Sequence, residues 1–166
     1  MTLIIEDGSQ VANANSYVTL IEARDYASAR GVALSAVDAE LEAVILKSMD
    51  YLESFANRFK GDRVSRDQAL SWPRVNVEIE GFTWASTEIP RQVLNALLAL
   101  IVEIHNGDDP YNPPKESLPV VRERVEGAVE VEYANPGQQL KVSKTQKSRS
   151  LINLLLKNSG LFAVRS

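Results

Sequence analysis

The sequence contains no cysteine and only one histidine, His105. A chain without thiols has no disulfide framework, no thiolate metal site and no cysteine nucleophile, and a single imidazole leaves little for a zinc site. His105 falls at the expected end of a helix, where an imidazole favourably faces the negative end of the helix dipole. The sequence also lacks a G-x-S-x-G element, a P-loop and a dinucleotide fingerprint. We therefore expect no catalytic residues, no metal, no cofactor and no enzyme activity.

Long apolar runs are missing as well. No stretch approaches the roughly 20 apolar residues that span a membrane, and the N-terminal sequence MTLIIEDGSQ has no basic region leading into a long apolar segment. We expect a soluble protein without membrane contact. A chain of 166 residues fits one domain with a core of its own.

Acidic residues are absent after Glu132, although the whole chain has a net charge of −4. A basic tail on an acidic body favours an acidic partner surface or a nucleic-acid backbone. We predict a body of residues 1–133 and a basic C-terminal tail of residues 134–166. The charged residues of this tail are Lys141, Lys144, Lys147, Arg149, Lys157 and Arg165.

Apolar residues at helical spacing predict helices over about 19–30, 38–55 and 90–106, and a short final helix in the sequence SLINLLLKNSG. Thr19 and Glu22 form a capping box at the start of the first helix, and Ser35 is expected to cap the second. The fold class is therefore mainly α, a small bundle of three to four helices plus the C-terminal short helix, with β-hairpin insertions.

Alternating apolar and acidic residues predict a β-hairpin over 75–88, turning at Gly81, and a further strand or hairpin around Gly127. Between the second helix and the first hairpin, the sequence QALSW is expected to form a short turn of helix. Pro73 ends this turn, because proline disfavours the helical conformation in the residue before it.

The helix expected after Pro90 is unusually apolar. Ten of the fifteen residues from Arg91 to His105 are apolar, and they lie around the whole circumference rather than along one stripe. A small domain is not expected to bury such a helix by itself, so we predict that part of it meets another subunit. The candidate interface residues are Leu97, Leu98, Leu100 and Ile101.

Two interpretations of Trp72 lead to different functions. Beside Arg74 it could be an exposed platform for a nucleic-acid base, since single-strand binders combine aromatic platforms with a positive groove. Alternatively it is buried as a packing residue, which we favour because acidic residues lie near both tryptophans. Trp84 with Phe82 is a second candidate platform. The basic tail has the charge for nucleic acid but a single aromatic residue, Phe162.

Five segments, in this order, resemble the small head-to-tail adaptor, or connector, proteins of tailed bacteriophages. They are ANSYVTLIEARDYASARG, AVILKSMDYLES, QALSWPR, IPRQVLNALLALIVE and VEGAVEVEYA. The resemblance runs from about Asn13 to Tyr133, and many sequences of this family are labelled as DnaT-like single-stranded-DNA-binding proteins. The sequence departs from the family in the insertion VNVEIEGFTWASTE and in its tail. The structural motif that carries the resemblance comprises Tyr51, Gln68, Leu70, Trp72, Pro73, Arg74, Ile89 and Pro90.

The resemblance implies a structural virion protein of the phage neck. It implies a homo-oligomeric ring, commonly dodecameric, between the portal protein and a tail-side stopper or tail terminator protein, lining a channel for phage DNA without sequence specificity. The protein would be found in the virion and, during assembly, in the host cytoplasm. The alternative is the literal label, a single-stranded-DNA-binding, DnaT-like replication protein. The candidate portal-docking residues are Lys144, Lys147, Arg149, Leu151, Leu154, Leu155, Leu161 and Phe162.

Overall fold

The computed structural model describes residues 2–111, 120–125, 129–133 and 146–157, with side chains for residues 2–111 and 147–157. Within these residues the protein is helix-rich, with small antiparallel strand pairs. No helix in this part of the chain combines the length and apolar character required to cross a membrane. The α-helices are α1 (Leu20–Ser28), α2 (Asp38–Glu53), α3 (Arg91–His105) and α4 (Gln146–Leu155).

Each sheet is a pair of short antiparallel strands. The first joins β1 (Asp62–Arg63) to β2 (Arg74–Val75), after the single 3-10 turn η1 (Ala56–Arg58). The second joins β3 (Val77–Ile79) to β4 (Phe82–Trp84), which confirms the hairpin predicted around Gly81. The third joins β5 (Val120–Val125) to β6 (Val129–Tyr133), in the region where a strand or hairpin was expected.

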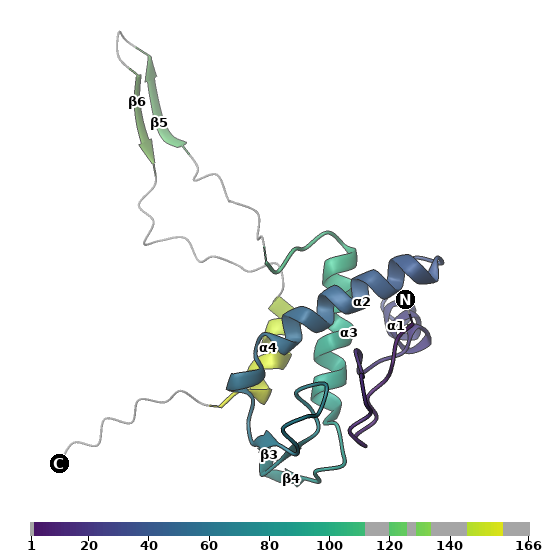
Figure 1. Ribbon diagram of the computed structural model, residues 1–166. Helices are drawn as coiled ribbons and strands as arrows, with labels where there is room; N and C mark the ends of the chain where they lie inside the picture. The colour runs from purple at the N-terminus through teal and green to yellow at the C-terminus, as the bar shows by residue number, and fades with distance from the viewer. Residues whose placement is uncertain (1, 112–119, 126–128, 134–145, 158–166) are drawn as a thin grey trace, which may run out of the picture.

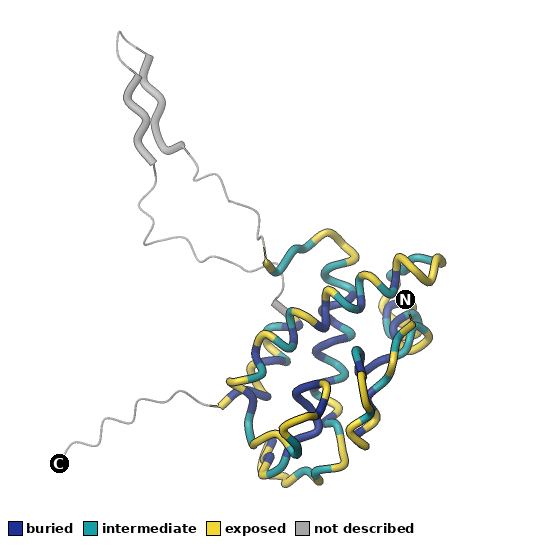
Figure 2. Tube along the Cα trace, in the orientation of Figure 1, coloured by how far each residue is buried: buried dark blue, intermediate teal, exposed yellow. Residues whose placement is uncertain are grey.

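Helix α3 is the centre of the fold and packs against each of the other three helices (Figure 1). Its side chains Leu97, Leu100 and Ile101 have no exposed surface, and Figure 2 colours stretches of α3 as buried. Neighbouring helices of the same chain therefore bury most of this apolar helix. From the sequence we expected another subunit to cover part of it. Of the four predicted interface residues, Leu98 alone is partly exposed. The other three are buried within their own chain and cannot contact another subunit.

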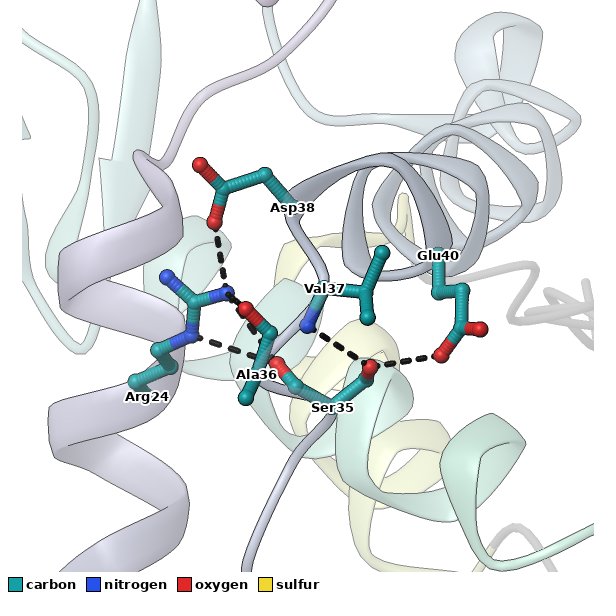
Figure 3. A network of polar contacts seen from close by, with 6 residues as sticks. All are labelled: Arg24, Ser35, Ala36, Val37, Asp38 and Glu40. Atoms are coloured by element: carbon teal, nitrogen blue, oxygen red, sulfur yellow. Dashed lines mark hydrogen bonds and ion pairs between the residues drawn. The ribbon is translucent and has the colours of Figure 1, made fainter.

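Helix α1 begins at the predicted capping box, in which the Thr19 hydroxyl accepts the Glu22 amide and the Glu22 carboxylate accepts the Thr19 amide. The start of α2 differs from the prediction, because Val37 rather than Ser35 is its N-cap residue. The Ser35 hydroxyl instead accepts the Val37 amide at 3.1 Å and donates to Glu40 at 2.6 Å (Figure 3).

The side chain of Arg24 ties the start of α2 to α1 (Figure 3). It donates to the backbone carbonyl of Ser35 and forms an ion pair of 2.7 Å with Asp38. The first two helices are thus held together at this end by polar contacts at the surface, where such pairs contribute little to stability.

Helix α4 belongs to the same core as the first three helices. Ile152 and Leu155 have no exposed surface, and Leu156 is 4% exposed. The backbone of this segment also joins that of η1, because the Lys60 amide donates to the Leu155 carbonyl and the Lys157 amide donates to the Arg58 carbonyl, both at 2.8 Å. The final helix predicted from the sequence is confirmed, but Leu155 is packed inside its own chain and is not available to dock on a portal protein.

Residues 68–73 form an irregular loop and not the turn of helix predicted for QALSW. Its side chains supply the hydrogen bonds that a helix would have made internally. The Gln68 amide donates to the carbonyls of Leu70 and Pro73, and its oxygen accepts the Ser65 amide. The peptide bond between Trp72 and Pro73 is cis. Trp72 is 1% exposed, which confirms the prediction that it is a packing residue.

Candidate nucleic-acid interface

Both tryptophans are poor candidates for base stacking. Trp72 is buried with its ring centroid 5.7 Å from that of Phe59. Trp84 is half-buried, and both indole N–H groups are buried with no hydrogen-bond partner among the described residues. Phe82 is 73% exposed, but Glu78 and Glu80 of the same hairpin are also exposed. Their charge disfavours a phosphate backbone there.

Arg74 cannot act as a free cation beside Trp72. Its guanidinium donates to the backbone carbonyls of Lys60, Gly61 and Ser71 at 2.8 to 3.2 Å. Burial lowers the pKa of Arg74 from its ordinary value, yet so basic a group stays charged at neutral pH. It joins the loop before β2 to the two residues that precede β1, and at 5% exposure it offers almost no surface to a ligand.

Buried hydrogen bonds and packing also hold the rest of the motif region in place. The Glu53 carboxylate on α2 accepts the Ser71 amide and hydroxyl and the Tyr17 phenol, while the Tyr17 oxygen accepts the Trp72 amide. Burial raises the pKa of Tyr17 well above its ordinary value, with a further contribution from the Glu53 charge. Leu70 and Pro90 are buried and Ile89 is half-buried.

A different set of aromatic residues meets near the end of α2. Tyr51 and Phe55 are four residues apart, so they lie on one face of the helical turn, with ring centroids 5.3 Å apart and nearly perpendicular. Tyr111, just beyond α3, places its ring centroid 5.4 Å from that of Tyr51, again perpendicular. Tyr111 is 55% exposed and Tyr51 is half-buried.

Asp109 fixes the position of Tyr111. Its carboxylate accepts the Tyr111 amide at 3.0 Å and forms an ion pair of 3.1 Å with Lys47 on α2. Burial raises the pKa of Tyr111, and the nearby charge of Asp50 raises it further. The phenol is therefore neutral at physiological pH and can donate a hydrogen bond.

Two guanidinium groups flank Phe55. Arg149 of α4 lies 4.9 Å from the ring centroid and donates to the Tyr51 hydroxyl at 3.2 Å. Arg58 of η1 lies 5.7 Å from the same centroid. Both distances fall within the roughly 6 Å range of cation–π attraction. We call Tyr51, Arg58, Tyr111 and Arg149, with the buried ring of Phe55 beneath them (6% exposed), the aromatic–arginine surface.

Helix α3 holds α4 in register with this surface. The Glu103 carboxylate accepts both the amide and the hydroxyl of Ser148, which has no exposed surface. Since Lys147 and Arg149 flank Ser148, this contact sets the direction of two cations of the basic tail. Lys60 and Lys157 lie at the other end of α4, where the Lys60 amide donates to the Leu155 carbonyl of α4 and the Lys157 amide donates to the Arg58 carbonyl of η1.

Each part of this arrangement has a known use with nucleic acid. Exposed rings stack on bases regardless of sequence, and guanidinium groups pair with phosphates and stack on ring faces. The basic tail and the aromatic residues, which are separate in the sequence, therefore meet in the fold. Among the described residues, no group of three or more His, Asp or Glu side chains could hold a metal ion.

The predicted docking residues of the tail are divided by the structure. Lys147 is exposed, Arg149 and Leu151 are half-buried, Leu154 is 43% exposed and Leu155 is buried. Lys144, Leu161 and Phe162 lie outside the described residues. Of these residues, Arg149 belongs to the aromatic–arginine surface, although the sequence resemblance predicted that it docks on a portal protein.

The sequence analysis did not identify the aromatic–arginine surface. Tyr51 was singled out for its place in the family motif, whereas Phe55 and Tyr111 were not assigned to a site. The four-residue spacing of Tyr51 and Phe55 was visible, but such a pair is typical of a helix packing against a core. The decisive contact joins Tyr51 to Arg149 across 98 positions, which no local pattern reveals.

The fold and this surface define a small helix-rich domain with a cation–aromatic face. Over its whole length, residues 1–166, the chain matches the family described as "Putative DnaT-like ssDNA binding protein". The chain therefore belongs to this family. No curated protein and no solved structure matches it.

The family match corrects the main functional prediction. A structural connector of the virion, with a portal and a tail-side protein as partners, was expected from the resemblance. The matching family is described by single-stranded DNA binding, which agrees with the alternative and not with the connector. The ring oligomer and its virion partners have no support in the comparisons.

Proposed function

We propose that this protein binds single-stranded DNA on the aromatic–arginine surface. The observation that carries the proposal is the position of Arg149. It brings a cation of the basic C-terminal segment onto the rings of Tyr51 and Phe55, in a chain whose family is described by this ligand.

Tyr111 is the base-stacking residue of the proposed site. It is the most exposed ring of the surface, and it packs perpendicular to the ring of Tyr51 rather than stacking face to face on it. The Asp109 carboxylate and the Lys47 ammonium hold its backbone in place, so little ordering of Tyr111 is required when a strand binds. Pre-organisation of this kind increases affinity because fewer side chains lose freedom on binding.

Phosphates of the strand would pair with Arg58 and Arg149. Of the two, Arg58 is exposed and Arg149 is half-buried. Contacts to ring faces and phosphates carry no base information, so we expect binding of any unpaired sequence and a strong dependence on salt. A base-paired duplex offers no free base faces to Tyr111 and should bind more weakly.

Fluorescence anisotropy with a labelled oligothymidylate tests the proposal. We expect the Tyr111→Ala variant to bind about 5-fold to 150-fold more weakly, the range for loss of one base–aromatic stack. Phe82→Ala is the matched control, because it removes another highly exposed ring, from the acidic hairpin; its affinity should equal that of the wild type. Circular dichroism checks that both variants are folded. Equal losses in the two variants, or none in Tyr111→Ala, would contradict the proposed site.

A further inference from the structure

A hollow of about 300 Å³ lies between α1 and α3. Its apolar side chains are Val18, Leu94 and Leu98, and its polar side chains include Asp25 of α1 and Asn95 of α3. This volume is at the lower end of the range for ligand pockets, about 300 to 1,000 Å³. It suits a single planar group better than a large ligand.

Tyr26 borders the hollow and connects it with the basic segment. The Arg30 guanidinium lies 3.4 Å from the Tyr26 ring centroid and is anchored by a hydrogen bond of 2.9 Å to the Tyr26 carbonyl. Lys147 of α4 places its ammonium 5.7 Å from the same ring. Two residues along α4, Arg149 contacts Phe55. The first turn of α4 therefore reaches aromatic residues on both α1 and α2.

The charges around the hollow are divided by sign. Asp25 and Glu22 contribute carboxylates, and one Glu22 oxygen is already occupied by Thr19 in the capping box. Arg91 lines the hollow, whereas Arg30 and Lys147 meet at the bordering Tyr26. A phosphate is repelled by the carboxylates and attracted to these cations. A base fits the lining better, because carboxylate oxygens accept hydrogen bonds from exocyclic amino groups.

The bases differ in what they offer to such a lining. Cytosine, adenine and guanine each carry an exocyclic amino group that can donate to the Asp25 carboxylate, and Asn95 can both donate and accept at the edge of the base. Thymine presents a carbonyl oxygen and a methyl group where adenine and cytosine present amino groups. Its carbonyl oxygens meet the carboxylate of Asp25 unfavourably.

We propose that the hollow between α1 and α3 binds one amino-bearing base, cytosine, adenine or guanine, of the DNA strand held on the aromatic–arginine surface. This inference rests on the proposed single-strand binding. It adds a second contact, with a base preference that stacking on Tyr111 does not produce. The strand would pass along the first turn of α4, with phosphates near Lys147.

Competition between an oligocytidylate and an oligothymidylate of equal length, at neutral pH, tests the inference. Lengths of about 4 to 16 nucleotides cover the usual sites of single-strand binders. We expect the wild-type protein to bind the cytidylate at least about 5-fold more tightly, the lower limit for base discrimination by a side-chain contact. Asp25→Ala should abolish this ratio while its affinity for oligothymidylate stays equal or rises.

Glu78→Ala is the matched control for charge, because Glu78 is an exposed carboxylate on the β3–β4 hairpin. It should keep the ratio of the two affinities. Tyr111→Ala should weaken both ligands by the same factor, which also keeps the ratio. Since Asp25 is exposed, its replacement leaves the core intact, and Leu98→Trp gives a second variant that fills the hollow.

The outcomes separate the two proposals. If the wild-type protein binds both oligonucleotides equally, the hollow does not take a base, although single-strand binding stands. A preference for cytidylate that survives both Asp25→Ala and Leu98→Trp also overturns the inference. If no oligonucleotide binds, the proposed function fails and this inference fails with it.

Discussion

Arg74 lies 5.9 Å from the ring centroid of Trp72, and Arg149 lies 4.9 Å from that of Phe55, so the two pairs have similar ring contacts. Their surroundings are opposite. Three backbone carbonyls accept hydrogen bonds from Arg74, which is 5% exposed. Arg149 is half-buried and, among the described residues, donates to the Tyr51 hydroxyl.

The hydrogen bonds of the guanidinium distinguish packing from binding where an arginine lies beside an aromatic ring. A guanidinium has five N–H donors in a fixed plane, and those of Arg74 are largely directed at the chain itself. Trp72 and Arg74 are two positions apart in the sequence and suggest a base platform, yet in the fold they pack the loop that leads into β2. The pair Phe55 and Arg149 is distant in sequence, and among the described residues this arginine donates one hydrogen bond, to the Tyr51 hydroxyl, against three for Arg74.

We expect the largest loss of stability for Trp72→Ala. We expect a loss of about 3 to 5 kcal/mol in the free energy of unfolding, the range for large aromatic truncations in cores. Urea unfolding followed by circular dichroism measures it. Phe82→Ala, at an exposed ring, should change the same quantity by less than about 0.5 kcal/mol.

The same variant separates packing from ligand contact. Under conditions where Trp72→Ala remains folded, its affinity for oligothymidylate should match that of the wild type. A well-folded Trp72→Ala protein that no longer binds the oligonucleotide would return Trp72 to the ligand site and reverse the comparison.

We expect the next largest loss of stability for Arg74→Gln. The variant removes the donor to the carbonyls of Lys60 and Gly61, just before β1, and of Ser71 in the β1–β2 loop, and hydrogen bonds from a charged group contribute about 1.5 to 3 kcal/mol each. Because glutamine can restore one of the bonds, we expect a loss of about 2 to 3 kcal/mol in unfolding free energy, measured by urea titration. A loss below about 1 kcal/mol would mean that the loop does not depend on Arg74.

Local sequence signals predicted several elements correctly for identifiable reasons. The capping box at Thr19 needs only residues three apart, and the β3–β4 hairpin needs only alternation around Gly81. The helical turn predicted for residues 68–72 was wrong, because backbone groups of this segment are satisfied by side chains, including that of Glu53, 18 residues before Ser71. Propensity cannot anticipate such long-range partners.

The candidate site was missed for a related reason. Charge segregation correctly marked the C-terminal segment as basic, but it could not show that α4 packs against α3 and delivers Arg149 to α2. The even apolar circumference of α3 was interpreted as a subunit interface. Three helices of the same chain cover it instead, and α4, the last of them, is the one that was assigned to a docking tail.

The smallest effect on stability is expected for Arg149→Gln. A partly exposed cation–π contact is worth about 0.5 to 1 kcal/mol, so the unfolding free energy should fall by no more than about 1 kcal/mol. Binding should respond differently, because the variant removes one phosphate contact. For single strands the slope of log affinity against log salt changes by about 0.7 per phosphate, which a salt titration of the anisotropy signal resolves.

Arg149→Lys and Arg74→Lys sharpen the contrast between the two arginines. Lysine keeps the charge but not the planar fork, so Arg149→Lys should retain most of the salt slope and most of the affinity for oligothymidylate. At position 74 the same replacement cannot reach three carbonyls in one plane, and stability should fall nearly as far as in Arg74→Gln. If instead Arg149→Lys and Arg149→Gln bind alike, with an unchanged salt slope, Arg149 contacts no phosphate. Its place over Phe55 would then be packing, as it is for Arg74 over Trp72, and the two pairs would differ only in exposure.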